Sequence, residues 1–181
     1  MMPMPLSDLV FDKLPGALAA VRTSVTATRL VELCRHVRDT GGTLVTLWGE
    51  DLRRDAQGFR LCVVLQHDNG LMVAELELPA VDPVFPNLAE IFPSASRLQR
   101  AVHDLVGLRA RGGDTRPWLR HAAWPADVFP LRHDAPAAAT DASDEYAFVR
   151  VEGEGVHEIP VGPVHAGTIE PGHFRFSVVD E

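Results

Sequence analysis

An apolar stripe at helical spacing runs through residues 26–40, where leucine, valine and cysteine side chains recur every three or four positions. Charged residues occupy most of the other positions, and Gly41-Gly42 follows the stripe. Glycine commonly ends a helix because it adopts positive φ without strain, so the pattern predicts a helix over 26–40. A second stripe predicts a helix that begins after Pro93 with a serine N-cap, runs to Val106 and is ended by Gly107.

Three segments between these helices have the pattern of strands. Residues 43–49 and 59–66 are apolar and rich in β-forming types, and residues 71–78 alternate apolar with polar side chains. Asp68-Asn69-Gly70 separates the last two segments, and Asn-Gly favours a hairpin turn because both residues accept positive φ. The alternation indicates one packed and one wet face. We therefore expect a two-layer α+β fold, with helices packed on a mostly antiparallel sheet.

The other segments divide by composition. Residues 1–22 are rich in Met, Pro and Ala, and we expect a loose arm there with room for one short element. A proline-rich connector is expected to hold a short helix at 87–91. Residues 109–134 are irregular, although their two tryptophans indicate that the segment packs against something. Residues 135–145 have the composition of a linker, which places the α+β domain at 1–134.

The tail, residues 146–181, is predicted to be extended and β-rich. Residues 146–151 and 174–179 each have the pattern of a strand. By itself such a tail cannot bury its apolar side chains. It either folds back on the domain or is added as a strand to a neighbouring protein of a complex.

The net charge of the chain and the distribution of its charged residues exclude some classes of partner. The formal net charge is −8, which argues against free nucleic acid or an anionic membrane surface as a partner. Residues 97–132 are nevertheless rich in arginine, whereas residues 141–181 are mostly acidic. This asymmetry indicates an arginine-bearing face made for an acidic partner surface or for the protein's own tail. No apolar run reaches the roughly 18 residues of a membrane span, and Met1 to Asp8 does not resemble a secretory signal.

Residue types that carry chemistry do not combine into a recognisable site. The two cysteines, Cys34 and Cys62, are too few for an iron–sulfur cluster and are expected to be buried and reduced. Three tail histidines, His157, His165 and His173, lack the spacing of a metal site. A nucleophile elbow and a phosphate-binding loop are also missing from the sequence. We therefore expect no catalytic residues and no cofactor in this chain, and rank an enzyme in its own right last among the alternatives.

Two stretches within 99–132 carry a family resemblance. Residues 99–108 read Gln-Arg-Ala-Val-His-Asp-Leu-Val-Gly-Leu, and residues 129–132 read Phe-Pro-Leu-Arg. They resemble the 30 kDa (C) subunit family of NADH dehydrogenases (complex I), whose signature is Glu-Arg-Glu, two residues, Asp-Leu-x-Gly, and a loop ending in His-Pro-Leu-Arg. The matching positions are Arg100, Asp104, Gly107, Pro130, Leu131 and Arg132. Gln99, Ala101 and Phe129 depart from the signature, which is typical of a divergent member.

Residues 158–176 carry a second resemblance. They are similar to the start of the catalytic domain in membrane-bound hydrogenases of the formate hydrogenlyase type, in which a domain of the 30 kDa family is fused ahead of the nickel–iron domain. The residues concerned are Gly162, Pro163, His165, Glu170, Pro171 and His173. In these hydrogenases the segment is a β-hairpin, and the respiratory relative begins with Gly-Pro-x-His-Pro near its quinone site. The present sequence runs to Glu181 and contains none of the large domain's cysteine pairs.

Together the resemblances imply a non-catalytic structural subunit of a membrane-associated NADH:quinone oxidoreductase-like or hydrogenase complex. Its partners would be the catalytic large subunit, of quinone-site or nickel–iron type, and iron–sulfur subunits. It would lie in the cytoplasm on the inner face of the cell membrane, attached only through partners, and would self-associate when isolated. The alternative is a stand-alone small-molecule or regulatory binding domain derived from such a protein. In that case the contact of the family would have been lost, which would explain why Gln99 and Ala101 replace the two glutamates of the signature.

One pair leaves two interpretations open. Arg100 and Asp104 lie four residues apart on the second predicted helix, where an ion pair along the helix would contribute only tenths of a kcal/mol. Alternatively, Arg100 reaches across to another segment or to a neighbouring protein.

Overall fold

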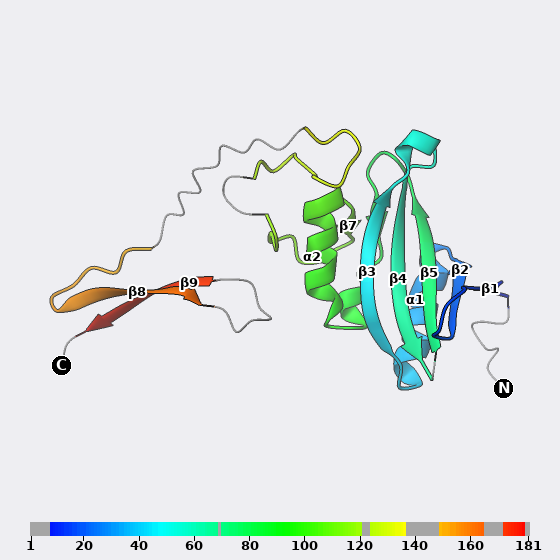
Figure 1. Ribbon diagram of the computed structural model, residues 1–181, viewed down its shortest axis with the longest axis horizontal. Helices are drawn as coiled ribbons and strands as arrows, with labels where there is room; N and C mark the ends of the chain where they lie inside the picture. Colours follow the sequence, from blue (N-terminus) through cyan, green and yellow to red (C-terminus); the bar gives the residue numbers. More distant parts are fainter. Residues whose placement is uncertain (1–7, 69, 121–123, 137–148, 165–171, 180–181) are drawn as a thin grey trace. The chain divides into compact units, whose positions relative to one another are not determined.

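Three long strands form the larger part of one sheet. They are β3 (Thr43–Asp51), β4 (Phe59–His67) and β5 (Gly70–Leu78). β4 pairs antiparallel with both of its neighbours, as the three strand patterns and the hairpin signal predicted. In the turn between β4 and β5, Asp68 has a φ of 51° and Asn69 lies outside the described residues. The sheet stands upright in Figure 1, with β3 at one edge.

The N-terminal arm contributes two strands that the sequence pattern did not reveal. β2 (Ala20–Ser24) pairs parallel with β5, and β1 (Asp12–Lys13) pairs antiparallel with β2. The strand order is therefore β1–β2–β5–β4–β3, in a mixed and mostly antiparallel sheet. β5, the partner of β2, lies some fifty residues further along the chain. The pair therefore has no hairpin turn of the kind that predicts the pairing of β4 with β5.

Two helices pack against the sheet. α1 (Ala27–Asp39) and α2 (Ala95–Val106) match the two predicted helices to within about a residue. The Thr26 hydroxyl caps α1 by accepting the N–H of Arg29, whereas Ser94 stands at the N-cap of α2 without a side-chain hydrogen bond. Gly107 ends α2 with a φ of 79°. Short elements complete the unit: η1 (Arg53–Asp55), β6 (Val84–Phe85), η2 (Leu88–Glu90) and β7 (Arg109–Ala110), with β6 parallel to β7.

The computed structural model divides the chain into two compact units, residues 1–142 and 143–181. It describes residues 8–68, 70–120, 124–136, 149–164 and 172–179. In this part of the chain no helix is long and apolar enough to cross a membrane.

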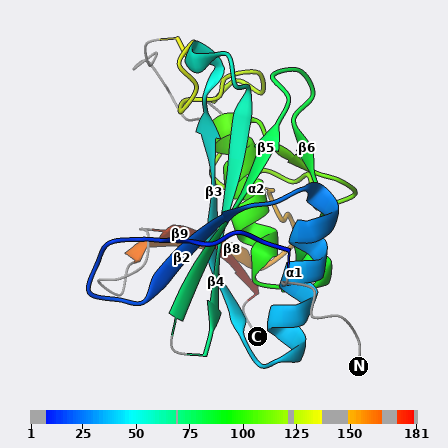
Figure 2. The same ribbon diagram turned by 90° about the vertical axis from the view of Figure 1, so that its right-hand side faces the viewer.

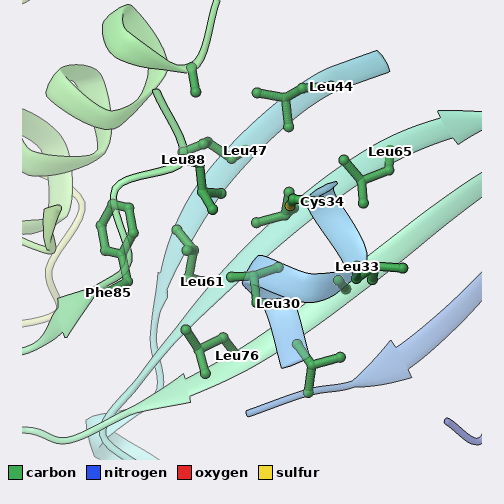
Figure 3. Close-up of a cluster of buried hydrophobic side chains, with 14 of the residues drawn as sticks. Leu30, Leu33, Cys34, Leu44, Leu47, Leu61, Leu65, Leu76, Phe85 and Leu88 are labelled. Atoms are coloured by element: carbon green, nitrogen blue, oxygen red, sulfur yellow. The ribbon is translucent and has the colours of Figure 1, made fainter. Parts of the chain in front are cut away.

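One face of the sheet carries the core of the first unit. Alternate residues of β4, from Phe59 to Leu65, join α1 and α2 in a single buried cluster. In Figure 3, Leu30 and Leu33 of α1 lie among leucines of β3, β4 and β5. In Figure 2, α1 lies to the right of the sheet, beside β4 and β5. Both cysteines are free and buried, as expected, and burial raises the pKa of each thiol to about 12.

The second unit is a hairpin of two strands, β8 (Val156–Val164) and β9 (Gly172–Val179), which pair antiparallel. The predicted strand at 174–179 is confirmed. Residues 149–151 of the other predicted strand are not in a strand, and its remaining residues lie outside the described part. Exposed apolar side chains are spread along both strands: Ile159, Val161, Val164, Phe174, Phe176, Val178 and Val179.

The core cluster predicts a large difference between two Leu→Ala substitutions. Leu61 is fully buried in β4, whereas Leu18 is 70% exposed. We expect Leu61→Ala to lower the free energy of unfolding by about 2–5 kcal/mol, because it removes buried methyl groups and leaves a cavity. Leu18→Ala should change it by less than about 0.5 kcal/mol. Urea denaturation of the two variants and the wild type measures both values, and similar losses would contradict this account of the core.

Candidate functional site

The residues of the first family motif gather at the C-terminal half of α2. Arg100 and Asp104 lie on the helix, and Gly107 ends it. The segment that follows, residues 109–134, returns to the same place, where the Leu131 N–H donates to the Leu105 carbonyl at 3.0 Å. The helix end and this returning loop form the candidate site, which we call the motif loop site.

Arg100 and Asp104 both point to the loop. The Nε of Arg100 donates to the Arg116 carbonyl and its Nη2 to the Pro117 carbonyl, each at 2.6 Å. One Asp104 oxygen accepts three consecutive backbone N–H groups, from Trp118 and Leu119 at 2.7 Å and from Arg120 at 3.2 Å. Of the two interpretations, the structure supports the one in which Arg100 reaches across to another segment.

The Asp104 carboxylate is buried yet remains charged. Its residue is only 3% exposed, and burial by itself would raise its pKa. The hydrogen bonds from the three backbone N–H groups favour the ionised form and outweigh burial, so the pKa of Asp104 is lowered. The carboxylate thus acts as a fixed negative acceptor for a loop segment that has no strand or helix to satisfy its N–H groups.

Arg132 closes the site from the other side. Its Nε donates to the Val106 carbonyl at 2.6 Å, and its guanidinium lies 4.2 Å from the Phe129 ring centre and 5.0 Å from that of Phe59. The carbonyls at the end of a helix have no partner within the helix, so a cation is favourable there. Gly107 leaves room for this contact, because a Cβ at that position would clash with the Arg132 guanidinium.

Two positions that depart from the family signature are also well packed. Gln99 is 4% exposed; its amide nitrogen donates to the Asn87 side chain at 2.9 Å, and its oxygen accepts the Leu88 N–H at 2.7 Å. Phe129 packs edge-on against His103, with ring centres 6.0 Å apart. A glutamate at 99 could not donate to Asn87 as Gln99 does, so the change fits its surroundings here.

Sequence reasoning missed a second anchor of the loop. Asp51, 8% exposed at the end of β3, accepts the His133 N–H at 3.0 Å and two guanidinium bonds from Arg53 at 2.7 and 2.9 Å. Arg53 also bonds Asp134, at 2.6 and 3.0 Å. The Arg53 bonds, with smaller help from backbone N–H groups, hold the pKa of Asp51 well below its usual range. A charged residue on the packed face of a strand was the available signal, since Leu47 and Gly49 share that face.

The residues of the tail motif lie in the other unit. Gly162 and Pro163, joined by a cis peptide bond, belong to β8, and His173 belongs to β9. Gly162 and His173 meet across the hairpin, where a Cβ on the glycine would lie 2.8 Å from the His173 Nδ1. His165, Glu170 and Pro171 lie outside the described residues. Among the residues that are described, no three His, Cys, Asp or Glu side chains converge as they would around a metal ion.

Comparison with known families identifies this arrangement. Residues 23–141 match the family described as the 30 kDa subunit of the respiratory-chain NADH dehydrogenase. The chain belongs to this family. The matched range includes both helices, the long strands and the whole motif loop site.

Similar curated proteins are named as parts of formate hydrogenlyase, hydrogenase-4 and NADH-quinone oxidoreductase. The chain is 33% identical to formate hydrogenlyase subunit 5 of Escherichia coli over 152 residues, covering 78% of this chain and 26% of that protein. It is 32% identical to hydrogenase-4 component G of the same organism, covering 77% and 27%. With the NADH-quinone oxidoreductase C/D subunit of Methylococcus capsulatus it shares 36% identity over 69 residues, covering 37% and 11%. The chain thus spans about a quarter of the two relatives that it matches most extensively.

Solved structures share the fold. A trypsin-resistant fragment of Nqo5 superposes with a TM-score of 0.51 at 19% identity, covering 59% of this chain and 89% of the fragment. A chain of the membrane-bound sulfane sulfur reductase, an archaeal respiratory membrane complex, superposes with a TM-score of 0.61 at 16% identity, covering 79% and 90%. The α+β fold is therefore that of known subunits of respiratory complexes.

Asp104→Asn tests the loop anchor. At pH 7 we expect the free energy of unfolding to fall by about 2 kcal/mol, because hydrogen bonds to an ionised group contribute about 1.5–3 kcal/mol. Folding lowers the pKa of Asp104, so its contribution is complete above the unfolded pKa of about 3.9 and is lost as the pH falls through the folded value. Urea denaturation between pH 7 and pH 3 should show the difference from wild type shrinking below about pH 4.

Hydrogen exchange provides the local control for that variant. The N–H groups of residues 118–120 should exchange faster in Asp104→Asn, while those of β4 keep their wild-type rates. A stability loss that does not change with pH, or uniform loss of protection, would contradict the anchor.

Gly107→Ala and Gly41→Ala form a matched pair, because both glycines follow helices with similar positive φ, 79° and 86°. Gly41 has open space around it, so its substitution should cost only the backbone strain, about 1 kcal/mol. At Gly107 the new methyl group would also meet Arg132 and, at 3.0 Å, the Phe129 ring. We expect a further loss of about 1–3 kcal/mol by thermal unfolding. Equal losses for the two variants would show that Arg132 does not fill this space.

Proposed function

We propose that this chain is a non-catalytic structural subunit of an NADH:quinone oxidoreductase-like or hydrogenase complex, and that it docks on the catalytic large subunit. The proposal rests on what the residues of the family motif bond to in this structure. Arg100, Asp104 and Arg132 bond to backbone groups of the same chain and fix the shape of a surface loop. Polar groups that hold a loop in this way are suited to maintaining a surface for contact.

The relatives support the same interpretation. Their names place them in formate hydrogenlyase, hydrogenase-4 and NADH-quinone oxidoreductase. By analogy, we infer that this chain lies in the cytoplasm on the inner face of the cell membrane, attached through its partners. Those partners would be a quinone-site or nickel–iron large subunit together with iron–sulfur subunits.

The hairpin of the second unit is the other proposed contact. Phe174 and Phe176 stack with ring centres 5.9 Å apart and are 51% and 50% exposed. A two-stranded hairpin is marginal alone in water, and such aromatic side chains favour burial against a partner. We propose that Gly162, Pro163, His165, Glu170, Pro171 and His173 mark the part that meets the large subunit.

A second candidate function rests on a groove between α1 and residues 84–91. It has a volume of about 290 Å³, and its lining includes the apolar Val31 and Ile91, two arginines, Arg35 and Arg111, and Glu90. Apolar walls with a few converging polar groups are typical of small-molecule sites. The alternative is accordingly a stand-alone binding domain for a small anionic molecule.

Affinity purification separates the two functions. The tagged chain is recovered from the membrane fraction of its own organism after mild detergent extraction, and its partners are identified by mass. We expect a quinone-site or nickel–iron large subunit together with iron–sulfur proteins, in fixed ratio to the tagged chain. The tag alone and the Leu61→Ala variant, whose core is weakened, are the controls. Recovery of the chain without a large subunit would overturn the structural role and favour the binding domain.

A further inference from the structure

Trp118 is an exposed tryptophan on a loop that is held in place. Its side chain is 46% exposed, although tryptophan is a costly residue to leave in water. The exposure is not a result of loose attachment. The Trp118 N–H is bonded to Asp104 at 2.7 Å, and the carbonyl of the preceding Pro117 accepts from Arg100 at 2.6 Å. The peptide group that precedes the indole is therefore fixed to α2 through both its carbonyl and its N–H.

Two arginines of α2 flank the indole. The guanidinium carbons of Arg97 and Arg100 lie 5.0 and 5.2 Å from the Trp118 ring centre, within the range of cation–π attraction. The two arginines are three residues apart and so lie on one side of the helix. The side chain of Trp118 is thus held in one orientation while almost half of it remains in contact with water.

The surroundings of Trp118 are positively charged within an acidic protein. Residues 97–120 contain six arginines and two aspartates, whereas the whole chain has a formal net charge of −8. One of the aspartates, Asp104, is buried beneath the loop. The other, Asp114, pairs with Arg116 at 2.6 Å. Arg116 is thus neutralised in part by Asp114, and the positive charge beside the indole comes from Arg97 and Arg100 of α2.

We propose that Trp118 is the anchor by which the motif loop site binds its protein partner. The occupant is a surface of the large subunit that offers an apolar slot for the indole and a carboxylate beside the slot for Arg97. This inference rests on the proposed function and names the residues through which the chain would contact the large subunit. Tryptophan and arginine are the residue types that most often dominate interface energies, and a preordered anchor loses little entropy on binding.

The proposal assigns different roles to motif residues and their neighbours. Arg100 and Asp104 are positioning residues, whose side chains are 14% and 2% exposed. The contact itself is made by Trp118 and Arg97, whereas Arg116 bonds the Asp114 carboxylate of this loop. Asp114 within the cluster disfavours a phosphate-bearing partner, so a protein surface fits better than a lipid headgroup or nucleic acid.

Trp118→Ala is the central test, with Trp48→Ala as its matched control. Trp48 is 38% exposed on β3, and its indole N–H donates to Glu50 of the same strand at 3.0 Å. The full-length tagged variants are titrated against detergent-extracted membranes of the source organism, and the large subunit recovered is measured by mass spectrometry. We expect Trp118→Ala to raise the apparent Kd about 30-fold or more, as loss of an interface anchor does, and Trp48→Ala to leave it unchanged. Thermal unfolding of each variant checks that the fold is kept.

Arg97→Glu tests the charge while leaving the backbone bonds of the loop to Arg100 and Asp104 in place. It should weaken recovery at low salt by about tenfold and by much less at about 0.5 M salt, because exposed charges are screened. Arg54→Glu, which changes the net charge equally at another exposed position, should have no effect. Comparison of Arg97→Glu with Arg54→Glu therefore tests the proposed contact even if Trp118→Ala proves unstable.

The outcomes separate the inference from the proposed function. If wild type recovers the large subunit and Trp118→Ala recovers it equally well, the anchor is wrong and the structural role stands. If wild type recovers no large subunit, the role fails and the anchor with it. Binding of wild type, but not of Trp118→Ala, to vesicles of phosphatidylglycerol and phosphatidylethanolamine, with recovery unchanged, would assign Trp118 to lipid and overturn the inference.

Discussion

A single buried carboxylate determines the shape of the loop that follows α2. Asp104 accepts the N–H groups of residues 118–120, three consecutive donors in a segment without strand or helix. Buried or half-buried backbone donors need acceptors, and an ionised carboxylate supplies several lone pairs from one position. An ion pair with Arg100 along the helix would have used the same lone pairs. The preference of both side chains for the loop therefore determines where residues 114–120 lie.

The return of the loop depends on a second charged group of the opposite sign. Arg132 donates to the last turn of α2 and packs on Phe59 and Phe129, while Asp51 and Arg53 hold residues 133 and 134. The loop is thus anchored near its middle and at its end, to the helix and to the sheet respectively. Because these bonds join segments as far as 82 residues apart, they form only when the whole unit is folded.

The sequence separation between interacting residues also decides which parts of the structure could be predicted from the sequence. Helices at 26–40 and after Pro93 and strands at 43–49, 59–66 and 71–78 have local periodicity, and the structure contains all of them. β2 has only five residues and a parallel partner far along the chain, so its pattern gave no signal. Arg100, Asp104 and Arg132 were found through the family resemblance, but their bonding partners were not. Backbone groups have no residue-type signature, so a side chain that bonds to them leaves its partner unmarked in the sequence.

The two units obtain order in different ways, and this bears on how the chain meets a partner. The first unit has its own buried cluster and rigid polar anchors, so its surface is fixed before any contact is made. The described strands of the hairpin have apolar residues exposed along their length, with Val179 at 67%. Two strands cannot supply a core by themselves, so the burial that stabilises them must come from a surface outside the hairpin. A preformed surface loses little entropy on association, whereas a segment ordered by its partner adds stability only after contact. In the proposed complex, the first unit would accordingly select the partner and the hairpin would hold it.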